Sequence, residues 1–143
     1  MLKAPHLGKG AHCVGCFGCW VKTQGECVLK DSYHDFGATL STCDELVIVS
    51  KCTYGGFSPF VKKVLDRSIP YISPFFKIIN GEMHHQKRYD HSMKMRAYFY
   101  GEGLSEREVK LAAKSFKAFA LNFHGQVLDV RFLKSFEEVE VLL

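Results

Sequence analysis

A continuous apolar run followed by a glycine loop and a capped helix is the feature that most limits how this chain can fold. Residues 45–50 read ELVIVS, which is short, apolar and typical of a strand buried on both faces of a parallel sheet. A Gly-Gly pair lies in the loop that follows, and Ser58 and Pro59 then form an N-cap with proline at the first helical position. The pattern predicts a strand, a loop and a helix that runs to about residue 67. The apolar residues expected to be buried by that helix are Phe60, Val61, Val64 and Leu65.

Two more strands and two more helices are predicted around this segment. Residues 95–100 and 126–133 have strand character, and residues 106–123, which follow a capping-box sequence, carry apolar side chains at helical spacing. Residues 31–42 predict a shorter helix, and residues 68–93 an irregular segment. Strands that alternate with helices are typical of a parallel, doubly wound sheet. We therefore expect an α/β fold in which helices flank a parallel sheet with three main strands.

The size of the chain fits one domain, residues 1–143, and 47% hydrophobic content is enough for a real core. We expect an irregular lead-in at residues 1–12, a cysteine-rich loop at 13–27 and an α/β core at 28–143. The net charge of +4 is mild and not concentrated in a run, so nucleic acid is not an expected partner. Without a signal-peptide pattern or an apolar run of about 18 residues, we expect a cytoplasmic protein with no membrane partner.

Four of the six cysteines are clustered at Cys13, Cys16, Cys19 and Cys27. In a reducing compartment such a cluster binds metal or does redox chemistry more often than it forms disulfides. Three cysteines at intervals of three and a fourth nearby are compatible with one iron–sulfur cluster. A four-thiolate zinc site and a loop without metal are the alternatives. Among metals the spacing favours iron–sulfur, because the two separated CxxC pairs of a zinc ribbon are missing.

The cysteine segment also carries a resemblance to a known family. Residues 13–31, CVGCFGCWVKTQGECVLKD, are similar to a segment of the flavodoxin-like NADPH-dependent FMN reductases, a group that includes the iron–sulfur flavoproteins. The motif of the latter is Cys-x2-Cys-x2-Cys with a fourth cysteine nearby, which implies a 4Fe-4S cluster at the four cysteines.

A second segment resembles the same family. Residues 50–58, SKCTYGGFS, are similar to its loop along the flavin ring, and the Lys, Asp and Arg that follow at family spacing are Lys62, Asp66 and Arg67. Two residues depart from the pattern, since Lys51 replaces a proline and Thr53 replaces the tyrosine that packs on the ring.

The resemblance implies FMN as cofactor, NAD(P)H as co-substrate and a small-molecule or protein electron acceptor. It also implies that residues 84–89 form a substrate-side or dimer loop. No catalytic residue is expected, because hydride transfer to a flavin needs no side-chain acid or base. Residues expected to bind the cofactor lie after the first two predicted strands, where parallel sheets bind ligands. They are Ser50, Cys52, Thr53, Tyr54, Gly55, Gly56, Phe57, Gly101 and Glu102.

The family's first strand and phosphate-binding loop have no counterpart in residues 1–12, so we expect an N-terminally truncated version of the fold. Losing three or four hydrogen bonds to the FMN phosphate would cost about 4–8 kcal/mol of binding free energy. An unpaired edge on the strand at residues 45–50 would favour a homo-oligomer. The alternative hypothesis is a non-enzymatic remnant that acts as a cysteine-rich metal-binding or interaction module.

Overall fold

The computed structural model describes residues 10–143, and most of the expected lead-in therefore lies outside the described residues. The chain divides into two compact units, which are described separately. One contains the residues up to Cys43 together with Lys63–His91, and the other contains Asp44–Lys62 together with Ser92–Leu143. Helix α3 (Pro59–Asp66) runs from the second unit into the first. It begins at the predicted proline and buries Leu65, but Phe60 is exposed, which corrects the prediction for that side chain.

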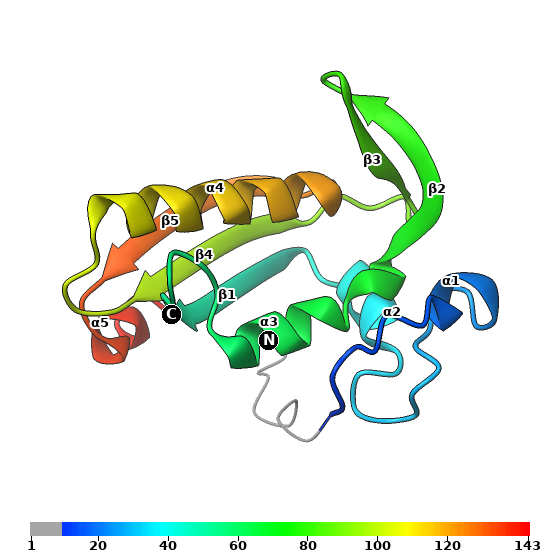
Figure 1. The fold of residues 1–143 in the computed structure, drawn as a ribbon, viewed down its shortest axis with the longest axis horizontal. Helices are drawn as coiled ribbons and strands as arrows, with labels where there is room; N and C mark the ends of the chain where they lie inside the picture. Colours follow the sequence, from blue (N-terminus) through cyan, green and yellow to red (C-terminus); the bar gives the residue numbers. More distant parts are fainter. Residues whose placement is uncertain (1–9) are drawn as a thin grey trace. The chain divides into compact units, whose positions relative to one another are not determined.

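A three-stranded parallel sheet forms the centre of the second unit (Figure 1). Its strands are β1 (Glu45–Lys51), β4 (Lys94–Tyr100) and β5 (Gln126–Leu133), in the order β1-β4-β5. Helices α4 (Glu106–Asn122) and α5 (Phe136–Glu140) flank the sheet and contact its strands. This unit confirms the predicted α/β class and the three parallel strands.

The apolar core of this unit is built on the middle strand. Met95, Ala97 and Phe99 of β4 are buried, and the Phe99 ring stacks between those of Phe57 and Phe132 at centroid distances of 5.2 and 5.3 Å. Strand β1 is buried at alternate residues only, which corrects the prediction of burial on both faces. β1 also lies at the edge of the described sheet, with β4 as its one neighbouring strand there.

Helix α4 follows directly from the sequence. Ser105 Oγ accepts a hydrogen bond from the N–H of Glu108, and the Glu108 carboxylate accepts one from the N–H of Ser105 at 3.0 Å. This reciprocal cap satisfies two donors that the first turn would otherwise leave free. The helix then buries Ala112, Phe116 and Ala120, as the apolar spacing predicts.

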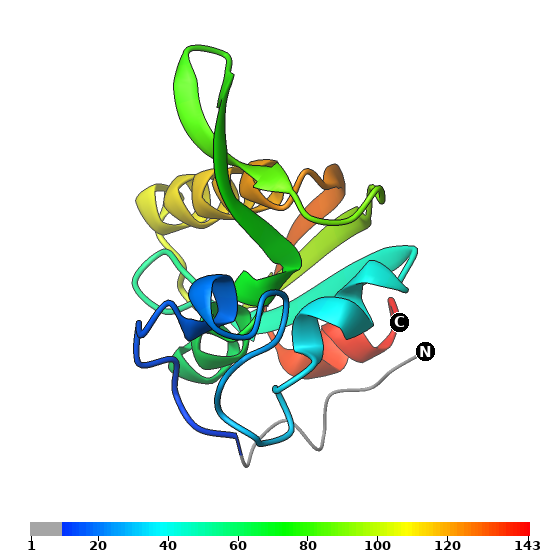
Figure 2. The same cartoon turned by 90° about the vertical axis from the view of Figure 1, so that its right-hand side faces the viewer.

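The first unit contains a β-hairpin that the sequence analysis missed. Residues expected to be irregular form a 3-10 turn at Ile69–Tyr71 and the antiparallel strands β2 (Ile72–Ile79) and β3 (Glu82–Lys87), seen as a long two-stranded arm in Figure 2. Asn80 and Gly81 both have positive φ values, 52° and 81°, and join the paired residues Ile79 and Glu82. This geometry is the two-residue turn for which Asn-Gly is the strongest sequence signal.

Two short helices complete the first unit, α1 (Gly18–Val21) and α2 (Phe36–Ser41). The predicted helix at residues 31–42 is wrong at its beginning, because α2 starts only at Phe36. The reason is that the Asp31 carboxylate accepts hydrogen bonds from Ala11, Tyr33 and Arg67, and so holds the preceding turn in a different conformation.

Candidate functional site

The carboxyl ends of the three parallel strands meet at one edge of the sheet. Beyond the strands, the N–H of Cys52 donates to the carbonyl of Tyr100 at 2.8 Å, and the N–H of Gly101 donates to the carbonyl of Leu133 at 3.0 Å. The loops after β1 and β4 therefore start side by side. Open parallel sheets bind their ligands at this edge.

The loop after β1 contains a tight turn that presents Tyr54. The N–H groups of Thr53 and Gly56 each donate to the other residue's carbonyl at 3.0 Å, and Tyr54 and Gly55 between them have φ values of 51° and 73°. Positive φ at both central residues defines a type I′ turn, which is unusual for a tyrosine. The Tyr54 side chain is 92% exposed. The chain thus holds a large aromatic ring in solvent at the carboxyl edge of the sheet.

Cys52 lies beneath this turn and is buried. Burial raises the pKa of its thiol, the nearby Glu108 carboxylate acts in the same direction, and the N–H groups of Gly55 and Gly56 oppose both effects.

Ser50 and Phe57 point into the protein rather than toward a ligand. Ser50 Oγ accepts from the N–H of Ser58 at 2.8 Å and donates to the carbonyl of Lys51 at 2.9 Å, which ties the two ends of the loop together. Phe57 packs against Phe99 in the core. Ser50 is buried and Phe57 is partly buried, so both residues shape the loop more than they offer a surface to a ligand.

The remaining candidates of the two loops differ in role. Thr53 closes the turn through its backbone, and Gly101 continues the strand ladder through its N–H. Glu102 is exposed at the same edge. Tyr54 and Glu102 are consequently the predicted site residues whose side chains are most available to a ligand.

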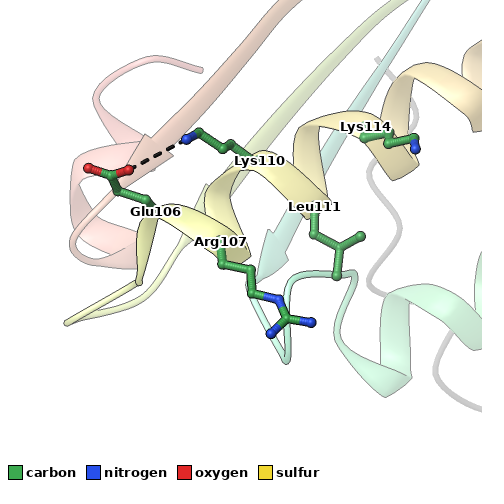
Figure 3. Close-up of a pocket in the computed structure, with 5 residues that line it drawn as sticks. All are labelled: Glu106, Arg107, Lys110, Leu111 and Lys114. Atoms are coloured by element: carbon green, nitrogen blue, oxygen red, sulfur yellow. Dashed lines mark hydrogen bonds and ion pairs between the residues drawn. The ribbon is translucent and has the colours of Figure 1, made fainter.

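A basic pocket on α4 lies beside the turn and was not found from the sequence. It has a volume of about 540 Å³ and is lined by Glu106, Arg107, Lys110, Leu111 and Lys114 (Figure 3). A Cβ on Gly55 would lie 3.0 and 3.1 Å from the Leu111 side chain, so the pocket adjoins the turn. Glu106 forms an ion pair with Lys110 at 3.5 Å, and the cationic side chains outnumber this one carboxylate. Such a pocket favours anionic groups.

The four clustered cysteines are not arranged as a ready ligand set. Cys13 and Cys16 are exposed, Cys19 and Cys27 are partly buried, and all four are free thiols. Burial and the neighbouring charges of Cys27, Cys13 and Cys16 raise the pKa of Cys19, so the four lie near one another. Within residues 10–143, however, no group of three or more possible ligands is placed to hold a metal ion.

Arg67 holds this cysteine segment in place. Its guanidinium, 1% exposed, donates to both carboxylate oxygens of Asp31 at 2.8 and 2.6 Å and to the carbonyl of Ala11 at 2.8 Å. Its charge lies 5.2 Å from the centroid of the Tyr33 ring. Burial lowers the pKa of Arg67, but the hydrogen bonds to Asp31 and the nearby charges of Cys27 and Asp31 outweigh this and raise it. Arg67 therefore places a positive charge beside one of the four sulfurs.

Comparisons of the chain with models of protein families, with curated proteins and with solved structures found no match. In the part of the chain that the structure describes, no helix combines the length and apolar character needed to cross a membrane.

Proposed function

We propose that this chain is a cytoplasmic flavodoxin-like protein that binds FMN and acts as an NAD(P)H-dependent oxidoreductase or an electron-transfer flavoprotein. The observation that carries the proposal is the exposed Tyr54 ring, held by a type I′ turn at the carboxyl edge of a parallel sheet. The similarity of the same segment, residues 50–58, to a flavin-side loop supports the proposal as well.

Each part of the site would make a separate contribution to binding. Tyr54 offers an aromatic surface on which a flat ring stacks, an interaction worth about 0.5–1.5 kcal/mol beyond the area it buries. Arg107, Lys110 and Lys114 attract phosphate groups to the same region. FMN, when bound, supplies the hydride and electron chemistry. The chain's own residues bind and orient the ring, and no side chain is required as an acid or base.

A titration of the full chain with FMN tests this proposal through the quenching of flavin fluorescence. We expect saturable binding that Tyr54→Ser weakens about tenfold, which corresponds to roughly 1.4 kcal/mol. Phe75→Ser is the matched control, because Phe75 is also an exposed aromatic but belongs to the other compact unit. Absence of binding, or equal weakening by both variants, would refute the assignment of this site.

A second candidate function is a cysteine-rich metal-binding module, with a 4Fe-4S cluster or zinc at Cys13, Cys16, Cys19 and Cys27. The specific observation in its favour is Arg67, which anchors the segment and lies beside Cys27. The loop would have to rearrange, because the described thiols do not form a ligand set.

Anaerobic reconstitution with iron and sulfide, and a parallel titration with zinc, test the second candidate. We expect Cys16→Ser to abolish the metal-dependent absorption or stoichiometric zinc binding. Cys43→Ser is the control, because Cys43 lies outside the clustered segment. A protein that stays colourless with iron and sulfide, and also leaves zinc unbound, contradicts it.

A further inference from the structure

The loop between Cys19 and Cys27 turns back on itself and brings its two ends together. Seven residues, 20–26, separate the two cysteines. The N–H of Gly25 donates a hydrogen bond to the carbonyl of Cys19 at 3.0 Å. Gly25 stands two residues before Cys27, so the chain returns to Cys19 just before it reaches the second cysteine.

A packing contact holds the same two ends together from the other side. Gly18 is buried, and a Cβ at this position would clash with Cγ1 of Val28, so the Val28 side chain packs directly against the Gly18 backbone. Gly18 directly precedes Cys19, and Val28 directly follows Cys27. The two cysteines therefore lie between a hydrogen bond and a packing contact that both join their chain segments.

The sulfur of Cys27 is also the clustered sulfur that lies nearest to Cys19. Burial is the largest cause of the raised pKa of Cys19, and the charge of Cys27 comes next, ahead of those of Cys13 and Cys16. Because the interaction between two charges weakens with distance, this order indicates that Cys27 is the closest of the three. Cys16 Sγ instead accepts a hydrogen bond from the N–H of Gly18 at 3.5 Å.

The position of Cys27 is fixed by His34 and Arg67. The N–H of Cys27 donates to the carbonyl of His34 at 2.8 Å, and His34 Nδ1 donates to the carbonyl of Cys27 at 2.7 Å. The buried guanidinium of Arg67 lies beside the Cys27 side chain. A bond between groups that are already held in place costs little further conformational entropy.

The partial burial of both thiols indicates which reagents reach them. Cys19 and Cys27 are partly buried, whereas Cys52 is buried. A small reagent can approach a partly exposed sulfur. Within the described residues no set of three or more possible metal ligands is assembled, so the arrangement favours a bond between two thiols over metal binding. Disulfides in a reducing compartment are usually transient and redox-sensing.

We propose that Cys19 and Cys27 form a reversible disulfide with small disulfides as the oxidant, a redox site independent of the proposed FMN site. One of the two thiolates attacks the small disulfide, whose S–S bond breaks, and one half leaves as a thiolate that takes up a proton. The other thiolate then attacks the protein sulfur of the mixed disulfide and releases the second half in the same way. Two protein thiols are oxidised, one small disulfide is reduced to two thiols, and two protons pass from the protein to these products.

A peptide map of the folded chain after equilibration in a glutathione redox buffer with a metal chelator tests this proposal. Trypsin cleaves after Lys22, which lies between the two cysteines. Once free thiols are alkylated, the proposed disulfide links two tryptic peptides, residues 10–22 and 23–30. A bond between two of the first three clustered cysteines stays inside the first peptide. We expect the linked peptides from a product with the intact mass of one chain, and their separation after reduction.

Serine variants identify which sulfurs are bonded. The yield of linked peptides should fall at least about tenfold in Cys19→Ser and in Cys27→Ser, because each removes one half of the bond. Cys16→Ser is the matched control, since it removes a neighbouring thiol of the same segment and should leave the yield unchanged. The same variant is expected to abolish metal binding in the second candidate function, so the two uses of the segment respond differently to it.

The map of the unmodified protein decides the proposal even where a variant fails to fold. Clustered thiols that stay reduced or carry only glutathione overturn it, and so does a disulfide confined to residues 10–22. Linked peptides that persist in Cys19→Ser, or vanish in Cys16→Ser, also overturn it, because Cys27 would then have another partner. Neither FMN nor metal is present in the assay, so these outcomes leave the flavin proposal untouched.

Discussion

Arg67 is the residue on which the cysteine segment most depends. A buried guanidinium needs partners for its charge and its donors, and here Asp31 and the carbonyl of Ala11 accept hydrogen bonds from its two terminal nitrogens, while Nε has no partner among the described residues. The three groups come from distant parts of the sequence. Their contact explains why a cysteine- and glycine-rich loop has a defined path.

Replacement of Arg67 by alanine should therefore destabilise the protein strongly. We expect a loss of about 3–5 kcal/mol in the free energy of unfolding, because Asp31 would lose its partner in a mostly buried setting. The free energy is measured by urea denaturation. Arg131→Ala is the control, since Arg131 is exposed and its pair with Asp129 is worth about 0–1 kcal/mol. Similar losses in both variants would show that the Arg67 contacts add little.

Asp31 also predicts how stability depends on pH. The hydrogen bond from Arg67 holds the pKa of Asp31 well below its usual range, although partial burial acts against this. A carboxyl with a lowered pKa in the folded state stabilises the protein above its unfolded pKa of about 3.9, and this contribution is lost as the pH falls further. We expect stability to decline below about pH 4, and less steeply in Asp31→Asn. Equal slopes of urea-derived stability against pH in the two proteins would contradict this.

At the scale of single elements, the type I′ turn after β1 makes the most specific demand on sequence. Gly55 combines a positive φ with close neighbours on α4, and this combination distinguishes it from Gly81, which has a positive φ and open space around it. Both glycines avoid backbone strain. Only Gly55 also avoids a steric clash.

Alanine substitutions at Gly55 and Gly81 distinguish the cost of backbone strain from the cost of a steric clash with α4. Gly81→Ala should cost about 1–2 kcal/mol, the usual strain of a left-handed alanine. Gly55→Ala should cost at least about 1 kcal/mol more, because its Cβ would press on Leu111. Thermal or urea unfolding measures both. A Gly55→Ala variant no less stable than Gly81→Ala would show that α4 moves aside without cost.

The elements that depend on local signals were predicted best. The capping box at Ser105 and the proline at residue 59 mark helix starts that the structure confirms. The hairpin was missed although Asn80-Gly81 is a strong turn signal, because prolines and a dense polar run obscured the alternation on either side. The late start of α2 could not be predicted, since it depends on the contact of Asp31 with Arg67, 36 residues away.

At the scale of the whole molecule, the predicted site residues do lie together at the carboxyl edge of the sheet, but their orientations could not be predicted. Ser50 is buried, Phe57 packs against Phe99, and Cys52 is buried under its own loop. Orientation depends on tertiary packing that spacing does not encode. The basic pocket has a local signal in its cations at residues 107, 110 and 114, but its position beside the turn appears only in the fold.

The burial of the thiols predicts an order of chemical reactivity across the reduced chain. Cys13 and Cys16 are exposed and should react first with an aromatic disulfide reagent, while the partly buried Cys19, Cys27 and Cys43 follow. Cys52 should react last, because burial both shields it and raises its pKa. The time course of absorbance at neutral pH measures this order. Cys52→Ser should remove the slowest phase, and persistence of that phase would assign it to another thiol.

The hydrogen bond between Ser50 and Ser58 has a thermodynamic consequence for any ligand at the turn. It closes the segment from β1 to α3 at its base, while Thr53 and Gly56 close it again near its tip. Because hydrogen bonds constrain the loop both at its base and near its tip, the loop has little conformational entropy to lose when a ligand binds. Ser50→Ala removes the hydrogen bond between the Ser58 N–H and Ser50 Oγ. This substitution should therefore make the entropy of ligand binding at Tyr54 less favourable, while the contacts between the loop and the ligand stay the same.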